Sequence, residues 1–177
     1  VFLLGGHPFR CWRRSGHGRI EMRKAIEQSC NSYFCQLGLK TGHRAIIHMA
    51  RAIGFGFRMG IDIDYEAPGL VPDEAWKRRV FKDDWRPGDT CNISIGQGAL
   101  LVTPLQMAVY TAALANGGQV YRPRLVRRGG ERAEKLNTLS WAEDTLSVVR
   151  GGMYDVVNAS RGTGKRARLE DVEVAAK

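Results

Sequence analysis

Three side chains near the start of the chain have the chemistry of metal ligands. Cys11, His17 and Cys30 offer two thiols and one imidazole, and such soft ligands are those that zinc prefers. Tetrahedral zinc takes four ligands, so a fourth would have to come from elsewhere. A buried Cys30 on a helix and a His17 in a loop explain the same residues equally well. The four cysteines, which include Cys35 and Cys91, are too few and too unevenly spaced for a disulfide scaffold, so we expect them to be buried singly or to bind metal.

The triplet Ser29-Cys30-Asn31 is a second candidate, with a hydroxyl and an amide two positions apart. By itself a Ser-x-Asn triplet is a weak signal, because a serine at a helix end with a solvent-facing asparagine gives the same pattern. The run Lys40-Thr41-Gly42 ends a predicted helix, where Gly42 serves as the C-terminal cap. Lys177 has no interpretation without a family to compare it with.

The glycine-rich segments do not form a phosphate-binding loop. Gly162-Thr163-Gly164-Lys165 lacks the earlier glycine, since Ala159 stands there, and Arg166 follows where a serine or threonine is required. Gly54-Phe55-Gly56 and Gly96-Gln97-Gly98 lack the third glycine of a dinucleotide-binding motif. We interpret these segments as turns.

Helices are the main predicted elements. Apolar residues at three- and four-residue spacing predict one helix from Ile20 to Gly42 and another from Arg44 to Ile53. The capping box Thr103-Pro104-Leu105-Gln106 predicts a helix that ends at Asn116-Gly117-Gly118. A second box, Ser140-Trp141-Ala142-Glu143, predicts the start of another helix.

Loops and short strands are expected between and after these helices. Residues 5–18 predict an irregular loop, and residues 60–89 predict a long excursion with one short helix around Asp73–Arg79. Strands are expected at Gln119–Tyr121 and Arg124–Val126. The closing residues, 172–177, alternate like a strand with one buried side.

Composition bounds the function classes. The 177 residues are 44% apolar and 25% charged, which is typical of a globular protein. No run approaches the roughly 20 apolar residues of a membrane helix, and Val1–Gly6 is too short for a signal peptide. The formal net charge is +9, but the basic residues are scattered and no interleaved aromatic residues are placed to stack on bases. A solvated basic surface is therefore favoured over a nucleic-acid partner.

Nine short motifs, in order along nearly the whole chain, resemble the penicillin-binding protein 2 family of class B peptidoglycan D,D-transpeptidases. One match arises easily by chance, whereas nine in the family's order do not. The resemblance implies the serine β-lactamase and penicillin-binding transpeptidase fold, which is α/β in the α+β sense. Residues 1–177 would be a partial transpeptidase domain, mostly its helical part and the start of the active-site strand. The motifs are Arg10-Cys11-Trp12, Gly16-His17-Gly18, Ser29-Cys30-Asn31-Ser32-Tyr33-Phe34, Gly54-Phe55-Gly56, Gly60-Ile61-Asp62, Gly88-Asp89-Thr90, Ile95-Gly96-Gln97-Gly98, Thr103-Pro104-Leu105-Gln106 and Ala115-Asn116-Gly117-Gly118.

Penicillin-binding transpeptidases use three motifs: Ser-x-x-Lys with the nucleophile, Ser-x-Asn, and Lys-Thr/Ser-Gly on a strand. Ser29-Cys30-Asn31 matches the second motif, and the resemblance implies that Ser29 relays a proton to the leaving amine while Asn31 holds the substrate backbone. Lys177 resembles the first residue of the third motif, where its charge would support Ser29 and attract the substrate carboxylate. Lys40-Thr41-Gly42 spells the third motif but is a decoy, because it ends a helix.

The first motif is absent from the chain, since no serine has a lysine three residues later. We therefore expect the nucleophile upstream of Val1 and the rest of the third motif after Lys177. By itself the chain is expected to be inactive.

The resemblance also gives the metal-ligand group a precedent. Some enzymes of the family hold a structural zinc beside the active site with two aspartates, a histidine and a cysteine. On that template His17 and Cys30 match ligands, Cys11 replaces an aspartate, and the remaining carboxylate lies upstream. Zinc is therefore the expected metal, and no organic cofactor is expected.

The implied activity is D,D-transpeptidation of peptidoglycan stem peptides during cell elongation, through an acyl-enzyme that β-lactams also form. The implied setting is the bacterial inner membrane, with this domain in the periplasm beside a membrane glycosyltransferase of the elongation machinery. Two alternatives remain. One is a catalytically degenerate scaffold or β-lactam sensor of the same fold, and the other is a basic binder of nucleic acid or membrane surfaces.

Overall fold

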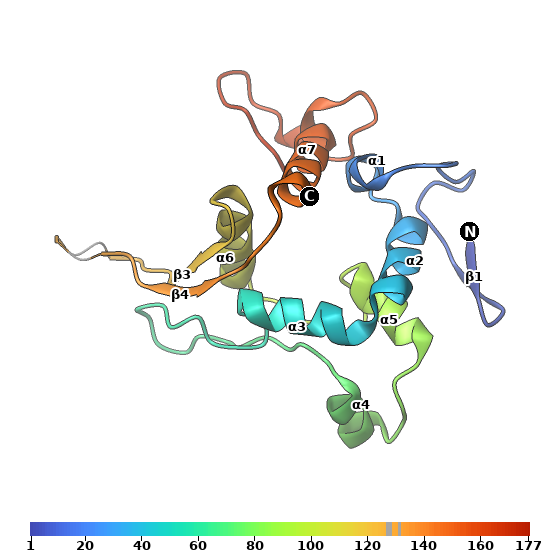
Figure 1. Cartoon of the computed structure of the whole chain (residues 1–177), viewed down its shortest axis with the longest axis horizontal. Helices are drawn as coiled ribbons and strands as arrows, with labels where there is room; N and C mark the ends of the chain where they lie inside the picture. The colour runs from blue at the N-terminus through green and yellow to red at the C-terminus, as the bar shows by residue number, and fades with distance from the viewer. Residues whose placement is uncertain (127–128, 131) are drawn as a thin grey trace. The chain divides into compact units, whose positions relative to one another are not determined.

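The computed structural model describes residues 1–126, 129–130 and 132–177, which form two compact units (Figure 1). The first unit comprises residues 1–37 and 142–177, and the second comprises residues 38–141. Helices dominate the described residues, and the strands form two small antiparallel sheets. None of the described helices is both long and apolar enough to cross a membrane.

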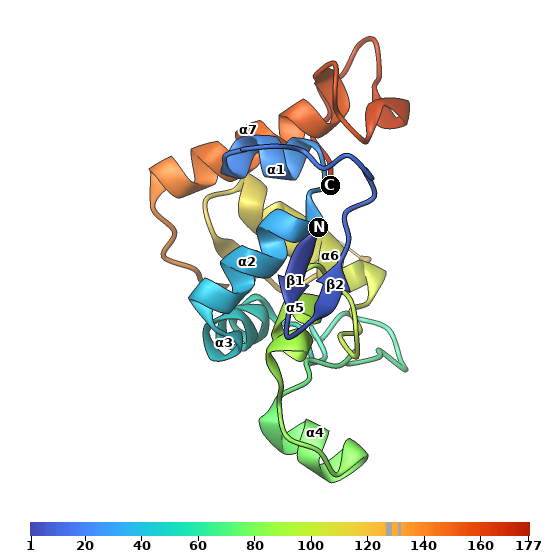
Figure 2. The same ribbon diagram turned by 90° about the vertical axis from the view of Figure 1, so that its right-hand side faces the viewer.

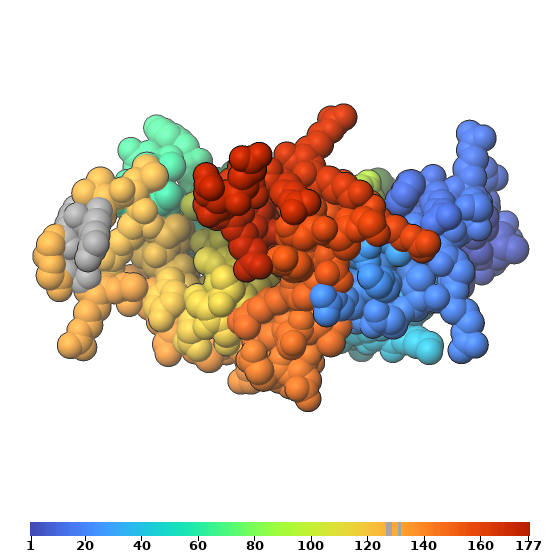
Figure 3. All heavy atoms as spheres, turned by 90° about the horizontal axis from the view of Figure 1, so that it is seen from above, coloured from blue at the N-terminus to red at the C-terminus, as the bar shows by residue number. Residues whose placement is uncertain are grey.

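The first unit is built on two helices from distant parts of the chain. Helix α1 (Met22–Glu27) packs against helix α7 (Glu143–Asn158), and both ribbon views show them side by side (Figures 1 and 2). Ile26 packs there with Val156 and Val157. Gly152 permits the close approach, because a Cβ at that position would lie 2.8 Å from Ile26 Cβ. In the space-filling view of Figure 3, C-terminal residues, in orange and red, lie next to N-terminal residues, in blue.

A β-hairpin precedes α1. Strand β1 (Phe2–Leu4) pairs antiparallel with β2 (His7–Phe9), and Figure 2 shows the two strands adjacent. Gly5 and Gly6 connect them with φ angles of +55° and +78°. A Gly-Gly pair with positive φ suits the tight turns that match strand twist. The predicted irregular loop is therefore wrong over residues 7–9, which form β2, whereas residues 10–18 are irregular as predicted.

The single helix predicted from Ile20 to Gly42 is wrong at its centre. Helix α1 ends at Glu27 and α2 (Asn31–Thr41) begins four residues later. Ser29 lies between them with a φ of +50°, which a right-handed helix does not allow. The apolar periodicity continues across the break, so it did not reveal the interruption.

Residues 172–177 do not form the predicted strand. Ala176 N donates to Met153 O at 3.1 Å, and Asn158 Nδ2 donates to Val174 O at 3.0 Å. Val174 and Ala176 pack against the α1–α7 core, so the alternation correctly predicted one buried side. These hydrogen bonds join the segment to α7 and not to a neighbouring strand.

Among its described residues, the second unit contains four further helices and one small sheet. The capping box at Thr103 is confirmed: Thr103 Oγ1 accepts from Gln106 N at 3.1 Å, and Gln106 Oε1 accepts from Thr103 N at 2.9 Å. Asp73 caps the short helix expected near it. The elements are α3 (His43–Ile53), α4 (Glu74–Phe81), α5 (Pro87–Ser94), α6 (Pro104–Ala115), β3 (Gln119–Tyr121) and β4 (Lys135–Thr138).

Two local predictions in the connecting segments are wrong. The partner of β3 is β4, and the strand predicted at Arg124–Val126 is absent. There the backbone N–H groups of Leu125 and Val126 donate to the Asp62 carboxylate at 2.8 and 3.2 Å. The second capping box is also not formed, because α7 has Ala142 at its N-cap and no side chain caps it.

Candidate active site

Ser29 lies in the short break between α1 and α2. Its φ of +50° is uncommon for a residue with a side chain and costs about 1–2 kcal/mol. Backbone hydrogen bonds hold the turn: Ser29 N donates to Ile26 O at 3.2 Å, and Cys30 N donates to Ala25 O at 3.0 Å. Asn31 is the first residue of α2. The break therefore places both residues of the Ser-x-Asn motif at the junction of two helices.

Lys177 contacts Ser29 from the other end of the chain. Its Nζ donates a hydrogen bond to Ser29 Oγ. The bond from Ala176 N to Met153 O fixes the preceding backbone on α7. Desolvation lowers the pKa of Lys177 below its usual value, because removing water penalises the charged ammonium. The structure thus brings together two of the three predicted catalytic residues, with Asn31 two positions along the chain from Ser29.

A hydroxyl that the sequence did not single out adjoins the same serine. Thr163, in the loop after α7, has its Oγ1 3.1 Å from Ser29 Oγ. The same Thr163 Oγ1 donates to Glu27 O at 3.2 Å. The glycines around Thr163 suggest only a failed phosphate loop, so no sequence signal marks it as a neighbour of Ser29.

Cys11, His17 and Cys30 come together as the predicted metal-ligand group. One ligand atom from each lies within 4.8 Å of the others, and Cys11 Sγ is 3.4 Å from His17 Nδ1. Cys30 is buried, and Cys11 and His17 are half-buried. The Trp12 ring packs edge-on against His17, with ring centroids 5.4 Å apart. Cys11 and His17, in the loop before α1, therefore lie next to Cys30, the residue that precedes α2.

The electrostatics of this group follow from burial. Desolvation, followed by the charge of Arg13, lowers the pKa of His17, so the neutral ring is favoured. Desolvation, with a smaller contribution from Cys11, raises the pKa of the Cys30 thiol. His17 Nε2 and Ser32 Oγ are buried without a hydrogen-bond partner among the described residues, and both residues line one cavity of about 420 Å³. Unpaired polar atoms at one cavity indicate room for a polar occupant.

Two motifs that the sequence analysis assigns no function, Lys40-Thr41-Gly42 and Gly162-Thr163-Gly164-Lys165, have structural explanations. Lys40 and Thr41 are the last residues of α2, and Gly42 follows with a φ of +83°, so Lys40-Thr41-Gly42 ends a helix as predicted. Lys165 opens a 3-10 helix and its Nζ donates to Ser160 O. Its amine therefore has a partner within its own loop.

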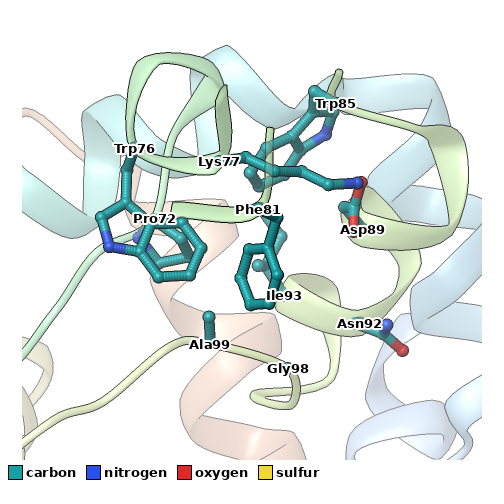
Figure 4. A pocket seen from close by; sticks show the side chains of 10 residues that line it. All are labelled: Pro72, Trp76, Lys77, Phe81, Trp85, Asp89, Asn92, Ile93, Gly98 and Ala99. Carbon is teal, nitrogen blue, oxygen red and sulfur yellow. The ribbon is translucent and has the colours of Figure 1, made fainter. Parts of the chain in front are cut away.

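A separate cavity of about 380 Å³ lies within the second unit (Figure 4). Trp76, Phe81 and Ile93 form an apolar wall, as the close view shows. Lys77 also lines the cavity and forms ion pairs with Asp83 and Asp89, which neutralise its charge. None of the predicted catalytic or metal-ligating residues lines this cavity.

Comparisons with known proteins identify the family and the fold of the chain. The family model for the penicillin-binding protein transpeptidase domain matches residues 3–177. The peptidoglycan D,D-transpeptidase MrdA of Acinetobacter baumannii is 37% identical over 175 residues, which cover 94% of this chain and 26% of that protein. The structure of Helicobacter pylori PBP2 in complex with MreC gives a TM-score of 0.88 at 35% identity, and the match covers 98% of this chain and 33% of that one.

A second similar structure is a peptidoglycan synthase complex that coordinates polymerization and crosslinking. It gives a TM-score of 0.75 at 32% identity, and the match covers 94% of this chain and 28% of that one. The chain spans about a quarter of the length of the curated relatives that it matches. The mixed fold of helices and small sheets confirms the expected fold class. Since the family model covers nearly the whole chain, this chain belongs to the penicillin-binding protein transpeptidase domain family.

Proposed function

We propose that this chain forms part of the active site of a bacterial peptidoglycan D,D-transpeptidase that cross-links stem peptides during cell elongation. The contact between Lys177 and Ser29 carries the proposal, because it joins two motif residues 148 positions apart. Membership of the transpeptidase family supports it. No serine here begins a Ser-x-x-Lys motif, so we assign the nucleophile to a segment outside residues 1–177.

Ser29 is the proton relay of this mechanism. The nucleophilic serine gives its hydroxyl proton to a base that lies, like the serine itself, outside residues 1–177, and attacks the D-Ala-D-Ala carbonyl. The terminal D-alanine leaves as an amine that must be protonated. Ser29 gives its hydroxyl proton to that nitrogen as the C–N bond breaks, and it regains a proton from the Lys177 ammonium. The lowered pKa of Lys177 makes this proton easier to release. An amine of a second stem peptide then resolves the acyl-enzyme.

Asn31 and Lys177 also bind the substrate. The Asn31 amide holds the substrate backbone by hydrogen bonds, which an amide can both donate and accept. The Lys177 ammonium attracts the substrate carboxylate. Penicillin and other β-lactams occupy the same site and acylate the same nucleophile.

Covalent labelling of the complete protein tests this function. A fluorescent penicillin is expected to form an adduct that maps by peptide mass analysis to a serine outside residues 1–177, with a lysine three positions later. An adduct on Ser29 would contradict the relay role. Absence of any adduct would favour a catalytically degenerate scaffold, and binding without acylation would favour a β-lactam sensor.

A structural zinc ion is the second part of the proposal. For zinc bonds of about 2.3 Å to sulfur and 2.0 Å to nitrogen, tetrahedral geometry places the two ligand atoms about 3.5 Å apart. Cys11 Sγ and His17 Nδ1 are 3.4 Å apart, which fits this value. The lowered pKa of His17 supplies the neutral imidazole that metal binding requires. The two thiols and imidazole fit zinc, with a carboxylate from outside these residues as the fourth ligand.

Zinc at this position would stabilise the turn that carries Ser29. As a thiol, Cys11 donates to Ser29 O at 3.9 Å. As a zinc-bound thiolate it would have no proton to donate, and ligation of Cys30, which directly follows Ser29, would hold the turn instead. Ligation of Cys11, His17 and Cys30 to one ion would tie the loop before α1 to the break after it. The zinc thus has a structural role, and no step of the reaction uses it.

The proposed location is the periplasmic face of the inner membrane, beside a membrane glycosyltransferase of the elongation machinery. The similar Helicobacter protein was solved with MreC, and another similar chain lies in a peptidoglycan synthase complex, which support such partners. Crosslinking the complete protein in cells is expected to recover a polymerase of glycan strands. Recovery of cytoplasmic partners alone would contradict this location.

A further inference from the structure

Thr163 lies directly behind the proposed relay serine. Its Oγ1 is 3.1 Å from Ser29 Oγ and 3.2 Å from Glu27 O. Glu27 is the last residue of α1, so Thr163 contacts both the end of that helix and the break that follows it.

Two glycines, Gly162 and Gly164, allow the loop around Thr163 to pack closely against the end of α7. Gly164 N donates to Val156 O at 2.8 Å. A Cβ at position 162 would lie 2.5 Å from Asp155 O, and one at position 164 would lie 2.8 Å from Val156 Cγ1. Only glycine fits at these separations, so the backbone on both sides of Thr163 is fixed in place.

The hydrogen bonds around Ser29 run in one direction. A carbonyl oxygen can only accept, so the single Thr163 hydroxyl proton is committed to Glu27 O. Towards Ser29, Thr163 Oγ1 is therefore an acceptor. Lys177 Nζ donates to Ser29 Oγ, which leaves the Ser29 proton to point at Thr163. The hydrogen bonds therefore form a chain in which Lys177 donates to Ser29, Ser29 to Thr163, and Thr163 to the Glu27 carbonyl.

We propose that Thr163 is a positioning residue for Ser29: it holds the Ser29 side chain in one rotamer and accepts a hydrogen bond from the Ser29 hydroxyl until a leaving nitrogen replaces Thr163 as the acceptor. This inference rests on the proposed function. Thr163 itself gains and loses no proton, because its own O–H remains bonded to Glu27 O. The gain in rate comes from a proton donor that is already oriented before the C–N bond breaks.

Leaving-group dependence distinguishes this role from a structural one. An amide nitrogen must be protonated as it leaves. The leaving group of a thioester is a thiolate, which needs no proton donor because its conjugate acid has a pKa of about 8.5. A residue that orients the donor matters for the first substrate and not for the second. A residue that only supports the fold affects both equally.

The experiment uses the complete protein and measures acylation by a D-Ala-D-Ala amide and by the matched thioester. Thr163→Val keeps the side-chain shape and removes the hydroxyl, and it is expected to slow amide acylation about tenfold while leaving thioester acylation within about twofold. Thr163→Ser keeps a hydroxyl at this position and is expected to acylate with the amide at about the wild-type rate. Thr111→Val, on the exposed face of α6, is the matched control and is expected to change neither rate.

A double-mutant cycle adds a second readout. In a Ser29→Ala background the Thr163→Val change is expected to have no further effect, because the donor that it orients is gone. Equal slowing of both substrates, failure of Thr163→Ser to rescue, or full additivity with Ser29→Ala would overturn the inference. If Thr163→Val does not fold, Thr163→Ala removes the same hydroxyl. A wild-type protein that no substrate or penicillin acylates overturns the proposed function itself, which is a distinct result.

Discussion

Arg23 on α1 and Asp155 on α7 form a two-point ion pair. Arg23 Nε lies 2.6 Å from Asp155 Oδ2, and Nη2 lies 3.0 Å from Oδ1. The pair fastens the two helices whose ends carry the site, since Ser29 follows α1 and Thr163 follows α7. The Asp155 side chain is 13% exposed, whereas the Arg23 side chain is 47% exposed.

Removal of one partner should therefore be costly. Arg23→Met leaves a buried carboxylate without its cation, and we expect a loss of about 1–3 kcal/mol in the free energy of unfolding, reduced by solvent at the exposed Arg23. Urea unfolding of the complete protein measures it. Arg19→Met is the matched control, because Arg19 is exposed and forms no ion pair among the described residues. Equal effects of both variants would show that the ion pair contributes nothing.

The same pair predicts how stability depends on pH. The hydrogen bond from Arg23, followed by its charge, lowers the pKa of Asp155 in the folded state. A lowered folded pKa stabilises the protein above the unfolded carboxyl pKa of about 3.9, and this contribution is lost as pH falls through the folded value. Asp155→Asn should therefore flatten the acid limb of the stability curve between about pH 5 and 2. An unchanged acid limb would contradict the assignment.

Gln106 is expected to be the most sensitive residue of the second unit. It is 1% exposed, and its Nε2 donates to Phe57 O and Pro68 O, both at 2.8 Å, while it also completes the Thr103 capping box. Gln106→Leu should lower the free energy of unfolding by about 1–3 kcal/mol, because buried carbonyls lose their donor. Gln97→Leu, at an exposed position, is the control and should have little effect.

The zinc proposal predicts one metal ion per chain. Metal analysis of the complete protein should find about one zinc, and a chelator should lower its melting temperature. His17→Ala should abolish both, whereas His48→Ala, at an exposed position on α3, should change neither. Zinc-free protein from zinc-supplemented cells, or full zinc in His17→Ala, would rule out this ligand set.

Local signals in the sequence predicted what local contacts determine. The Thr103 capping box and the end of α3 at Ile53 depend on residues within one turn, and both are as predicted. The break at Ser29 was not predictable, because periodicity does not report a positive φ at a serine. The alternation of apolar residues in 172–177 correctly predicts one buried side. The hydrogen bonds of this segment go to α7, and its own sequence does not reveal that partner.

The site divides in the same way. Family motifs predict Ser29, Asn31 and Lys177 as catalytic residues, and residue type predicts the three metal-ligating candidates. Thr163 was missed because its role depends on contacts 134 and 136 positions away in the sequence. Only the packing of its loop on α7 places it beside Ser29.

Acylation of the complete protein by a labelled penicillin, compared among wild type, Ser29→Ala and Lys177→Met, tests the central claim most directly. We expect each variant to slow acylation by about 10²–10⁴-fold, as loss of a general acid and of its support requires. Ser15→Ala, an exposed serine in the same unit, should acylate at the wild-type rate. Wild-type rates in Ser29→Ala and Lys177→Met would contradict the assignment of this pair to the active site.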